Sequence, residues 1–368
     1  MPTPPRVAAF TDTYLPTVNG VTYTVATWRE RWAARGDRMA VVYPDSDHVA
    51  GTDEYPVRSV AFPFYEGFRF AAPLVPAGVD DDALDVVHAH TPFTMGLAAR
   101  RLASRRSVPL VASYHTPAAE YAEYLFSGDR PTAAVRRLAA RYERWFYASA
   151  DVVLAPSATA REDLLDRGVD APVEVVPNGV DLERFRPVDA TDFRERHGLD
   201  DADRLVGYTG RHGYEKRLCD LVEAAADLDA RVVLGGDGPA RETLEAMAGP
   251  DADVRFLGFL DREEMPAFYS ALDVFAFPSP VETQGIVALE ANACGTPVVG
   301  ADAGALADTV RAGETGYRFP AEDPDALRAA VEQALAESEA LGESCLDRRE
   351  EISVERAVDE LVRVYDGL

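Results

Sequence analysis

Short runs rich in valine and alanine alternate with helical stretches along this chain, beginning at residue 7. The strands expected in the first half are Val7–Phe10, Arg38–Tyr43, Asp85–His90, Val108–His115, Asp151–Pro156 and Val173–Pro177. Strands that alternate with helices are typical of parallel sheets whose neighbouring strands are joined by crossover helices. The sequence therefore predicts an α/β fold.

The same pattern starts again after the segment PNGVDLERFRP. The strands expected in the second half are Leu205–Thr209, Arg231–Leu234, Val254–Leu257, Val274–Pro278 and Thr296–Val299. Because 368 residues exceed what one hydrophobic core usually serves, we expect two doubly wound domains, residues 1–185 and 186–348, followed by a final segment, 349–368. The similar runs ADVVLAPS and LDVFAFPS suggest equivalent strands in the two domains. Ligands of such folds bind at the carboxyl ends of the strands, which predicts a site in the cleft between the domains.

The charge balance of the chain limits its partners. The formal net charge is −26, and Lys216 is the one lysine among 37 basic residues. Such an acidic chain lacks the basic surface that general nucleic-acid binding needs, and its composition suggests a halophilic cytosol. The three cysteines lie far apart and form neither a disulfide framework nor a zinc motif. Without a signal sequence or an apolar run of membrane-spanning length, the chain is expected to be cytoplasmic.

The segment SPVETQGIVALEANACGTPVV is the most specific motif of the second half. Gly285 opens a predicted helix, and the backbone N–H groups of Gly285, Ile286 and Val287 could therefore hold a diphosphate. Glu290, about two turns along this helix, could accept hydrogen bonds from ribose hydroxyls. Glu282, in the loop before the helix, would face a sugar.

A second motif, GYTGRHGYEKRL, places Arg211 and Lys216 between a strand and a helix. Cleavage of a nucleotide-sugar bond leaves a diphosphate on which negative charge grows, and cationic groups must meet that charge where it develops. A guanidinium fork and a compact ammonium suit this task. The chain otherwise uses arginine, so its single lysine at this position favours a functional role.

Further candidates lie at predicted strand ends in the first half. His115 follows one strand and could hydrogen-bond a phosphate or sugar, whereas packing explains His88 and His90 at least as well. Asp12 could hold an acceptor hydroxyl, and Gly20 opens a helix whose backbone could approach a phosphate. The glycine-rich turn LGGDGP is interpreted as a tight turn. The acidic triplets DSD and DAD are not interpreted as metal sites, because neither follows a convincing apolar strand.

Taken together, the motifs HTP, PNGVDLERF, GRHGYEKR, FLGFLDREEM and ETQGIVALEANACGTPVV occur in the order seen in one enzyme family. The chain resembles the GT4 family of retaining glycosyltransferases, which have the GT-B fold. The resemblance implies an N-terminal acceptor-binding domain, a C-terminal nucleotide-sugar-binding domain and a last helix that packs back on the first domain. It also implies that no metal or other cofactor is needed.

The same resemblance assigns roles to the site residues. Arg211 and Lys216 would bind the donor diphosphate, Glu290 the ribose and Glu282 the transferred sugar, with His115 beside the reacting centre. The glycine matching Gly20 contacts phosphate in family members. Phe259 would lie in a segment that contacts the base largely through its backbone, which does not decide between UDP and GDP; UDP is the nucleotide we expect. The departing diphosphate would take the acceptor's proton, so that no strong enzymic base is required.

The acceptor is expected to be a membrane lipid. The combination of FTDTYLP, NGV and ETQG is most similar to diacylglycerol glucosyltransferases and phosphatidylinositol mannosyltransferases. A basic, aromatic helix is predicted nearby and is typical of helices that bind membrane surfaces. Its proposed contact residues are Arg136, Arg137, Arg141, Arg144 and Trp145, with Leu138 and Tyr142 on a neighbouring face. The aromatic segment FPFYEGFRF is a second candidate contact.

Three alternatives remain open at this stage. The closest is a transferase that acts on a soluble or lipid-linked sugar, as in N-glycan or exopolysaccharide assembly. A nucleotide-sugar epimerase of GT-B fold would convert the donor without an acceptor. A non-catalytic sugar-binding protein would share the two-domain logic but would need an export signal, which this sequence does not show.

Overall fold

The computed structural model describes residues 5–61, 69–80, 83–115, 133–249 and 253–368, with side chains of the helix after residue 132 described from Arg137 onward. The chain forms two compact units, here called unit 1 (Met1–Gly179 with Val354–Leu368) and unit 2 (Val180–Ser353). The division follows Gly179, whereas the sequence analysis placed it at residue 185. The segment that returns to unit 1 begins at Val354 rather than at residue 349.

Unit 1 contains a seven-stranded parallel sheet in the order β3-β2-β1-β6-β7-β8-β9. Its strands are β1 (Val7–Phe10), β2 (Met39–Pro44), β3 (Glu54–Val57), β6 (Val86–Ala89), β7 (Leu110–Ser113), β8 (Val152–Ala155) and β9 (Val173–Val175). A separate antiparallel pair joins β4 (Ser59–Ala61) and β5 (Arg69–Ala71). The helices are α1 (Gly20–Ala34), α2 (Ala77–Asp80), α3 (Thr94–Arg106), α5 (Ala133–Tyr147), α6 (Ala158–Asp166) and α15 (Val354–Asp366).

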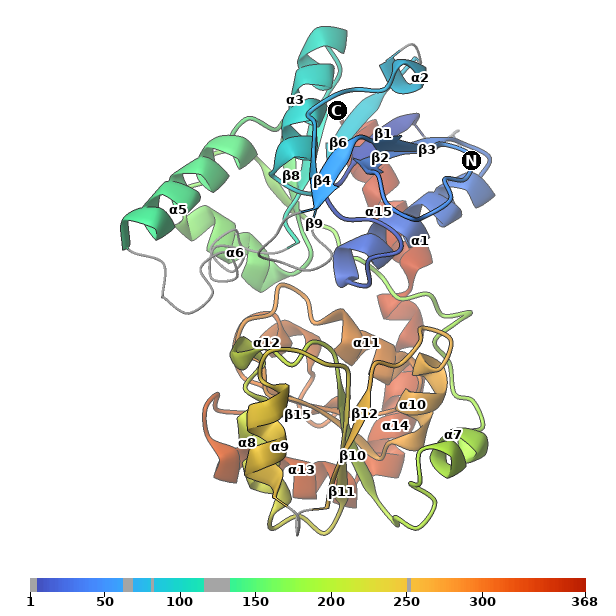
Figure 1. The fold of residues 1–368 in the computed structure, drawn as a ribbon, viewed down its shortest axis with the longest axis vertical. Coiled ribbons are helices and arrows are strands. Elements are labelled where there is room, and N and C mark those ends of the chain that lie inside the picture. The colour runs from blue at the N-terminus through green and yellow to red at the C-terminus, as the bar shows by residue number, and fades with distance from the viewer. Residues whose placement is uncertain (1–4, 62–68, 81–82, 116–132, 250–252) are drawn as a thin grey trace. The chain divides into compact units, whose positions relative to one another are not determined.

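Both faces of this sheet are buried, which explains why its strands read as continuous apolar runs. Alternate residues such as Ala8 and Phe10 face a core that α3, α5 and α6 complete. The intervening residues, such as Val7 and Ala9, face a second core with α1 and α15. Figure 1 shows α15, in red, beside the blue helix α1, and its residues Val354, Val358 and Leu361 are fully buried.

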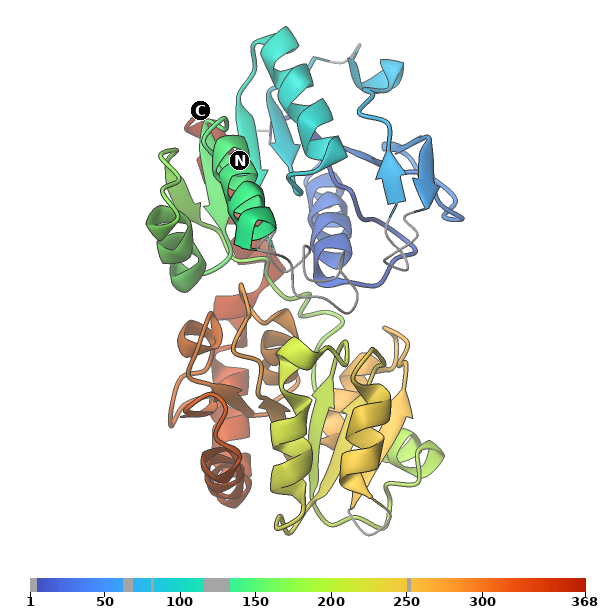
Figure 2. The same cartoon turned by 60° about the vertical axis from the view of Figure 1, so that its left-hand side comes forward.

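Unit 2 contains a six-stranded parallel sheet in the order β12-β11-β10-β13-β14-β15. The strands are β10 (Leu205–Thr209), β11 (Arg231–Gly235), β12 (Val254–Gly258), β13 (Val274–Phe277), β14 (Val298–Ala301) and β15 (Gly316–Phe319). The helices are α7 (Thr191–Arg196), α8 (Leu218–Ala225), α9 (Arg241–Ala248), α10 (Met265–Ala271), α11 (Ile286–Ala293), α12 (Leu306–Thr309), α13 (Pro324–Ala336) and α14 (Ser338–Asp347), with 3-10 turns at Tyr214–Lys216 and Arg349–Ile352. Helices α8 and α9, in yellow-green and yellow in Figure 2, lie side by side over the sheet.

The expected α/β architecture of two doubly wound units is confirmed, but one detail of the sequence analysis is wrong. The run ADVVLAPS forms β8, which lies three strands from β1 in its sheet, whereas LDVFAFPS forms β13, directly beside β10. The two strands therefore occupy different positions in their sheets. The two sequences are similar because both strands are buried on both faces of their sheets, which favours a short run of apolar residues.

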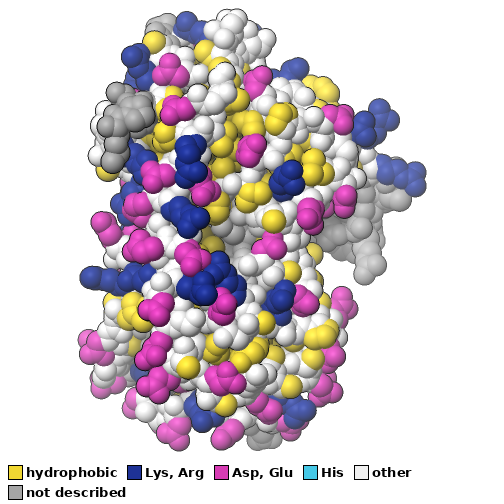
Figure 3. Space-filling view, turned by 180° about the vertical axis from the view of Figure 1, so that it is seen from behind, with side chains coloured by type: hydrophobic (Ala, Val, Ile, Leu, Met, Phe, Trp, Pro, Cys, Tyr) yellow, Lys and Arg dark blue, Asp and Glu magenta, His cyan; other side chains and the backbone are white. Residues whose placement is uncertain are grey.

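Acidic side chains spread over the face shown in Figure 3 and are interspersed with arginines. Many form ion pairs within the described part of the chain. Arg231, for example, contacts Asp201 and Asp253, with its Nε 2.6 Å from an oxygen of Asp253. The Arg231 side chain is itself only 9% exposed, whereas pairs in which both side chains are exposed contribute little stability individually. The net charge acts mainly on solubility.

Candidate active site

Unit 2 changes the direction of its strand order between β10 and β13. From β10 the chain proceeds outward to β11 and β12, and then returns to place β13 on the other side of β10. In open parallel sheets, ligands bind at the carboxyl ends of the strands at such a switch point. Arg211 lies just beyond the end of β10, and Glu282 lies in the loop that follows β13. The topology therefore brings together the two most specific motifs of the sequence.

Lys216 and Glu282 are in direct contact at this switch point. The ammonium Nζ of Lys216 lies 2.7 Å from Oε1 of Glu282, and the two side chains are 20% and 14% exposed. Lys216 ends a 3-10 turn that starts at Tyr214, while Arg211 is half-buried in the same loop. The only lysine of the sequence thus meets the first glutamate of the second motif.

The backbone around Glu282 is fixed by the turn before α12. Ala305 donates its backbone N–H to the carbonyl of Glu282 at 2.9 Å. Gly304 has a φ of +52°, and a Cβ there would lie 3.0 Å from the carbonyl oxygens of Pro280 and Glu282. Only glycine lets the two segments approach so closely without displacement. This contact holds the backbone from which the Glu282 side chain projects.

Helix α11 begins at the same switch point. Gly285 precedes it in the left-handed region, with a φ of +72°, and a Cβ at this position would lie 2.8 Å from Leu306. An α-helix leaves its first N–H groups without intrahelical acceptors, and these groups with the helix dipole attract anions. The first residues of α11 are Ile286 and Val287, so the helix begins one residue after Gly285, where the sequence analysis expected it to start, and shortly after Glu282 of the Lys216–Glu282 pair.

Glu290 lies in the interior of α11 and is 7% exposed. The hydroxyl of Tyr269, on α10, donates to its Oε2 at 2.9 Å, and a guanidinium nitrogen of Arg262 lies 3.8 Å from its Oε1. Burial raises the pKa of Glu290, and the Arg262 charge and the Tyr269 hydrogen bond partly oppose this shift. Tyr269 and Arg262 were missed by the sequence analysis, since a tyrosine within an apolar helix gives no signal of a polar partner.

The glycine-rich segment after β11 packs against the Arg211 loop. A Cβ on Gly236 would lie 2.0 Å from the carbonyl oxygen of Gly210, and one on Gly238 would lie 2.7 Å from that of His212. The tight-turn interpretation accounts for this close backbone approach. His212 is fully buried, bonds the Gly235 carbonyl through Nε2, and burial lowers its pKa.

Phe259 follows the end of β12, at the edge of the sheet, and its side chain is 62% exposed. The resemblance assigned the segment around Phe259 to backbone contacts with the base, and the structure places this segment just beyond a strand end. The strand order separates it from the Lys216–Glu282 pair, because β11 lies between β12 and β10.

The sheet of unit 1 has its own switch point, between β1 and β6, and Asp12 lies just beyond the end of β1. Its two oxygens accept hydrogen bonds from the hydroxyls of Thr91 and Thr94, at 2.6 and 2.7 Å, and from the Met95 N–H at 3.1 Å. Burial raises the pKa of Asp12, and these hydrogen bonds partly oppose this shift. Asp12 therefore caps the start of α3, a role that the sequence analysis, which assigned it to an acceptor hydroxyl, did not expect.

His115 follows β7 and contacts a second histidine. His90 Nδ1 and His115 Nε2 lie 3.1 Å apart, and the planes of the two rings are nearly parallel, at an angle of 12°. Burial lowers the pKa of His115 to about 4, so the ring is neutral at physiological pH. His88 is fully buried, with Nδ1 2.6 Å from the hydroxyl of Tyr365 and Nε2 2.8 Å from that of Ser113.

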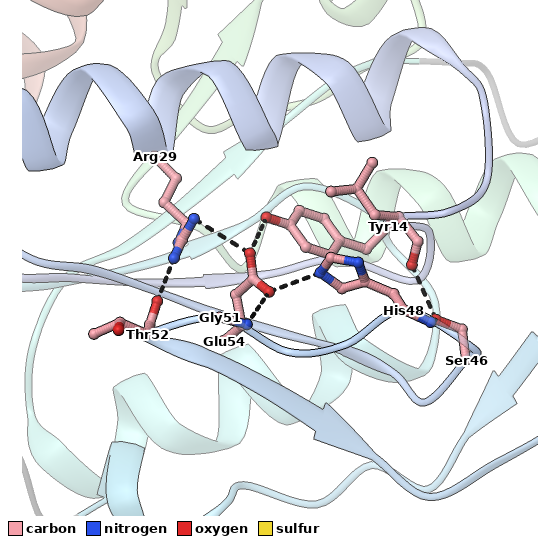
Figure 4. A network of polar contacts seen from close by, with 8 residues as sticks. Tyr14, Arg29, Ser46, His48, Gly51, Thr52 and Glu54 are labelled. Carbon is pink, nitrogen blue, oxygen red and sulfur yellow. Dashed lines mark hydrogen bonds and ion pairs between the residues drawn. The ribbon is translucent and has the colours of Figure 1, made fainter.

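Gly20 is the first residue of α1, and Asn19 caps the helix by accepting a hydrogen bond from the Thr22 N–H at 2.8 Å. The loop that leads to Gly20 is tied down by the carboxylate of Glu54 (Figure 4). This carboxylate accepts from Tyr14 Oη at 3.0 Å, His48 Nε2 at 2.8 Å and the Gly51 N–H at 2.8 Å, and pairs with Arg29. Burial opposes the charge of Glu54, but these contacts together lower its pKa.

Helix α5 presents a basic and aromatic surface. Leu138 is 71% exposed and Trp145 is 46% exposed, and the Arg100 guanidinium lies 4.9 Å above the Trp145 ring. The side chains of Arg137, Arg141 and Arg144 are exposed as well. Tyr142 is half-buried and donates to the Pro92 carbonyl. The side chain of Arg136 and most of FPFYEGFRF lie outside the described residues.

Within the described residues, no group of three or more metal-ligating side chains is found. Of the two acidic triplets, Asp251 and Ala252 lie outside the described residues. Asp45 accepts a hydrogen bond from Ser59, and Asp253 pairs with Arg231. Among the described helices, none has both the length and the apolar character that crossing a membrane requires.

Comparison with known proteins identifies the family. Residues 18–184 match the family described as Glycosyltransferase Family 4, and residues 189–351 match Glycosyl transferases group 1. A GDP-mannose-dependent alpha-mannosyltransferase of Mycobacterium tuberculosis is 31% identical over 99% of this chain and 97% of its own. An alpha-monoglucosyldiacylglycerol synthase of Streptococcus pneumoniae is 29% identical over 80% of this chain and 70% of its own.

Solved structures show the same architecture. The HepE protein of Anabaena, solved in complex with UDP and glucose, has a TM-score of 0.77 and 20% identity, with coverage of 99% of this chain and 100% of that chain. This likeness concerns the fold alone. Together with the two family matches and the two parallel-sheet units, it establishes that the chain belongs to the family 4 glycosyltransferases, enzymes of GT-B fold.

Proposed function

We propose that this enzyme transfers a hexose from a nucleotide-diphosphate sugar to an acceptor hydroxyl with retention of anomeric configuration. The observation that carries the proposal is the Lys216–Glu282 pair at the switch point of unit 2, directly before the start of α11. Lys216 and Arg211 would neutralise the departing diphosphate together with the N–H groups of Ile286 and Val287. Glu282 would then bind the sugar, and Glu290 the ribose.

The proposed donor carries UDP, although the relatives differ in this respect. HepE was solved with UDP and glucose, whereas the mycobacterial relative is named for GDP-mannose. The discriminating experiment is a thermal-shift screen of UDP- and GDP-sugars in high salt. A ligand at a hundred times its Kd stabilises the folded protein by about 2.7 kcal/mol, which raises Tm by a few degrees. Stabilisation by no sugar nucleotide would contradict the proposal.

We further propose that the enzyme works without a metal, because Arg211 and Lys216 supply the positive charge that a divalent ion provides elsewhere. Transfer measured with and without EDTA tests this point. Equal rates are expected, and a rate restored only by added Mg²⁺ or Mn²⁺ would contradict it.

The proposed acceptor is a membrane lipid, reached from the surface that Leu138 and Trp145 form with the arginines of α5. The pneumococcal relative, named for a glucosyldiacylglycerol product, supports this choice. In the salt-rich cytosol that the composition suggests, the Debye length is only about 3 Å, and long-range attraction between the arginines and an anionic lipid surface is therefore screened. Apolar insertion and close arginine–phosphate contacts must then supply the affinity for the membrane. Radiolabelled product that extracts into organic solvent would identify a lipid acceptor, whereas water-soluble product would favour a sugar acceptor.

Replacement of Trp145 by alanine is expected to weaken binding to anionic liposomes about tenfold, because the variant lacks the apolar contact that the half-exposed indole would make with the bilayer. Sedimentation of Trp145→Ala with vesicles of phosphatidylglycerol measures this loss. Met247→Ala is the matched control, because Met247 is also half-exposed but lies on α9 of unit 2. Equal sedimentation of both variants would contradict a membrane role for α5.

A further inference from the structure

Three histidines form a continuous row at the carboxyl ends of β6 and β7. His88 and His90 are stacked with ring centroids 4.0 Å apart, and the rings of His90 and His115 are nearly parallel, with an interplanar angle of 12° and centroids 5.4 Å apart. One end of the row is anchored by α15, whose Tyr365 hydroxyl lies 2.6 Å from His88 Nδ1. The other end is His115, which the resemblance to GT4 enzymes implies to lie beside the reacting centre. His90 lies between them.

His90 is buried at a cost that packing does not explain. Its side chain is 1% exposed, and its Nε2 is buried without a hydrogen-bond partner among the described residues. Leaving such a group unpaired costs about 1–3 kcal/mol, and an apolar residue would avoid this cost. The one hydrogen-bond partner of its ring among the described residues is His115, whose Nε2 lies 3.1 Å from Nδ1 of His90. The contact with His115 is therefore what the imidazole of His90 provides.

The row is uncharged, so the position of each proton matters. Burial lowers the pKa of His88, His90 and His115, and the mutual proximity of the rings lowers the first two further. Neutral His90 carries one proton, on Nδ1 or on Nε2. With the proton on Nε2, a buried N–H would lack an acceptor; with the proton on Nδ1, only a lone pair is left unpaired. Buried N–H groups without acceptors are the rarer case in proteins.

We propose that His90 is a positioning residue, which donates its Nδ1–H to His115 Nε2 and thereby fixes both the ring orientation and the tautomer of His115. His115 then carries its own proton on Nδ1, where the ring can donate to a hydroxyl or phosphate oxygen of the substrate. The row from Tyr365 through His88 holds His90 in place. This inference rests on the proposed role of His115 in sugar transfer.

The tautomer can be read directly. In protein labelled with ¹⁵N-histidine, two-bond ¹H–¹⁵N correlation spectra distinguish protonated from bare ring nitrogens, and the variants His90→Asn and His115→Ala assign the signals. The expected result is a protonated Nδ1 and a bare Nε2 for both His90 and His115. A proton on Nε2 of His115 would overturn the proposal. The measurement needs no activity, so it remains decisive if the proposed function is wrong.

Kinetics test the consequence. His90→Leu removes the donor but fills similar space, and we expect kcat to fall on the order of tenfold to a hundredfold, as for lost outer partners of site histidines, with KM for the donor nearly unchanged. His90→Asn keeps an N–H close to the position of Nδ1 and should restore most of the rate. His197→Leu is the control, because His197 also has a buried Nε2 without a hydrogen-bond partner among the described residues but belongs to unit 2, where its ring packs beside Phe193.

The outcomes separate the two proposals. Wild-type enzyme that transfers no sugar contradicts the proposed function, while the tautomer spectra still decide the role of His90. Wild-type activity with an unaffected His90→Leu variant contradicts the positioning role alone. A His90→Asn variant as slow as His90→Leu contradicts it as well. An equal Tm in the three proteins excludes a general loss of folding as the cause.

Discussion

Replacing Lys216 by alanine is expected to lower kcat by a hundredfold or more, the size of effect seen when a group that stabilises developing negative charge is removed. The structure adds a second reason, because the substitution also leaves the Glu282 carboxylate unpaired where a diphosphate would bind. The measurement is steady-state transfer with a radiolabelled donor. Near-normal kcat in Lys216→Ala would falsify the assignment of Lys216 to the departing diphosphate.

Two further variants control this experiment. Arg241→Ala removes a cation of similar exposure from the same unit, where it pairs with Glu245 on α9, and it should leave kcat within about twofold.

Glu282→Gln removes the carboxylate that holds the Lys216 ammonium. It should bind the nucleoside diphosphate more tightly than wild type but transfer sugar slowly, since the sugar contact is lost. Weaker diphosphate binding would show that the pair does not compete with phosphate.

Replacing Asp12 by alanine is expected to lower the free energy of unfolding of unit 1 by about 3 kcal/mol. The substitution leaves the donors of Thr91, Thr94 and Met95 without the acceptor that caps α3, and each buried donor without a partner costs about 1–3 kcal/mol. All three tryptophans of the sequence, Trp28, Trp32 and Trp145, belong to unit 1. Denaturation followed by tryptophan fluorescence therefore reports on this unit.

Asp151→Ala is the matched control for Asp12→Ala. Asp151 also accepts a hydrogen bond from a backbone N–H, that of Leu110 at 2.8 Å. Because Asp151 is exposed, water can take the place of its carboxylate in the variant. The expected loss is below about 1 kcal/mol. If Asp12→Ala destabilised no more than Asp151→Ala, the capping role of Asp12 would be refuted.

Much of the fold follows from local patterns in the sequence. The strands Val7–Phe10 and Leu205–Thr209 were predicted with their observed bounds, because buried parallel strands need continuous apolar runs. The antiparallel pair β4–β5 and the edge strand β3 were not predicted, since their residues are partly exposed and carry no such run. The similarity of β8 and β13 misled for the same reason, because any strand buried on both faces has this composition.

The sequence by itself determined which residue types lie at the strand ends of each unit, including Lys216, Glu282, Gly285 and His115. Each of these residues lies within a few positions of the strand or helix that carries it, and the apolar pattern and the glycines of that short segment determine where the strand or helix ends. The tertiary structure alone decided which of these groups touch, because contacts such as Lys216–Glu282 and Tyr269–Glu290 join segments far apart in the chain. It also decided that Asp12 caps a helix and that His90 contacts His115, since only the order of the strands brings β1, β6 and β7 together.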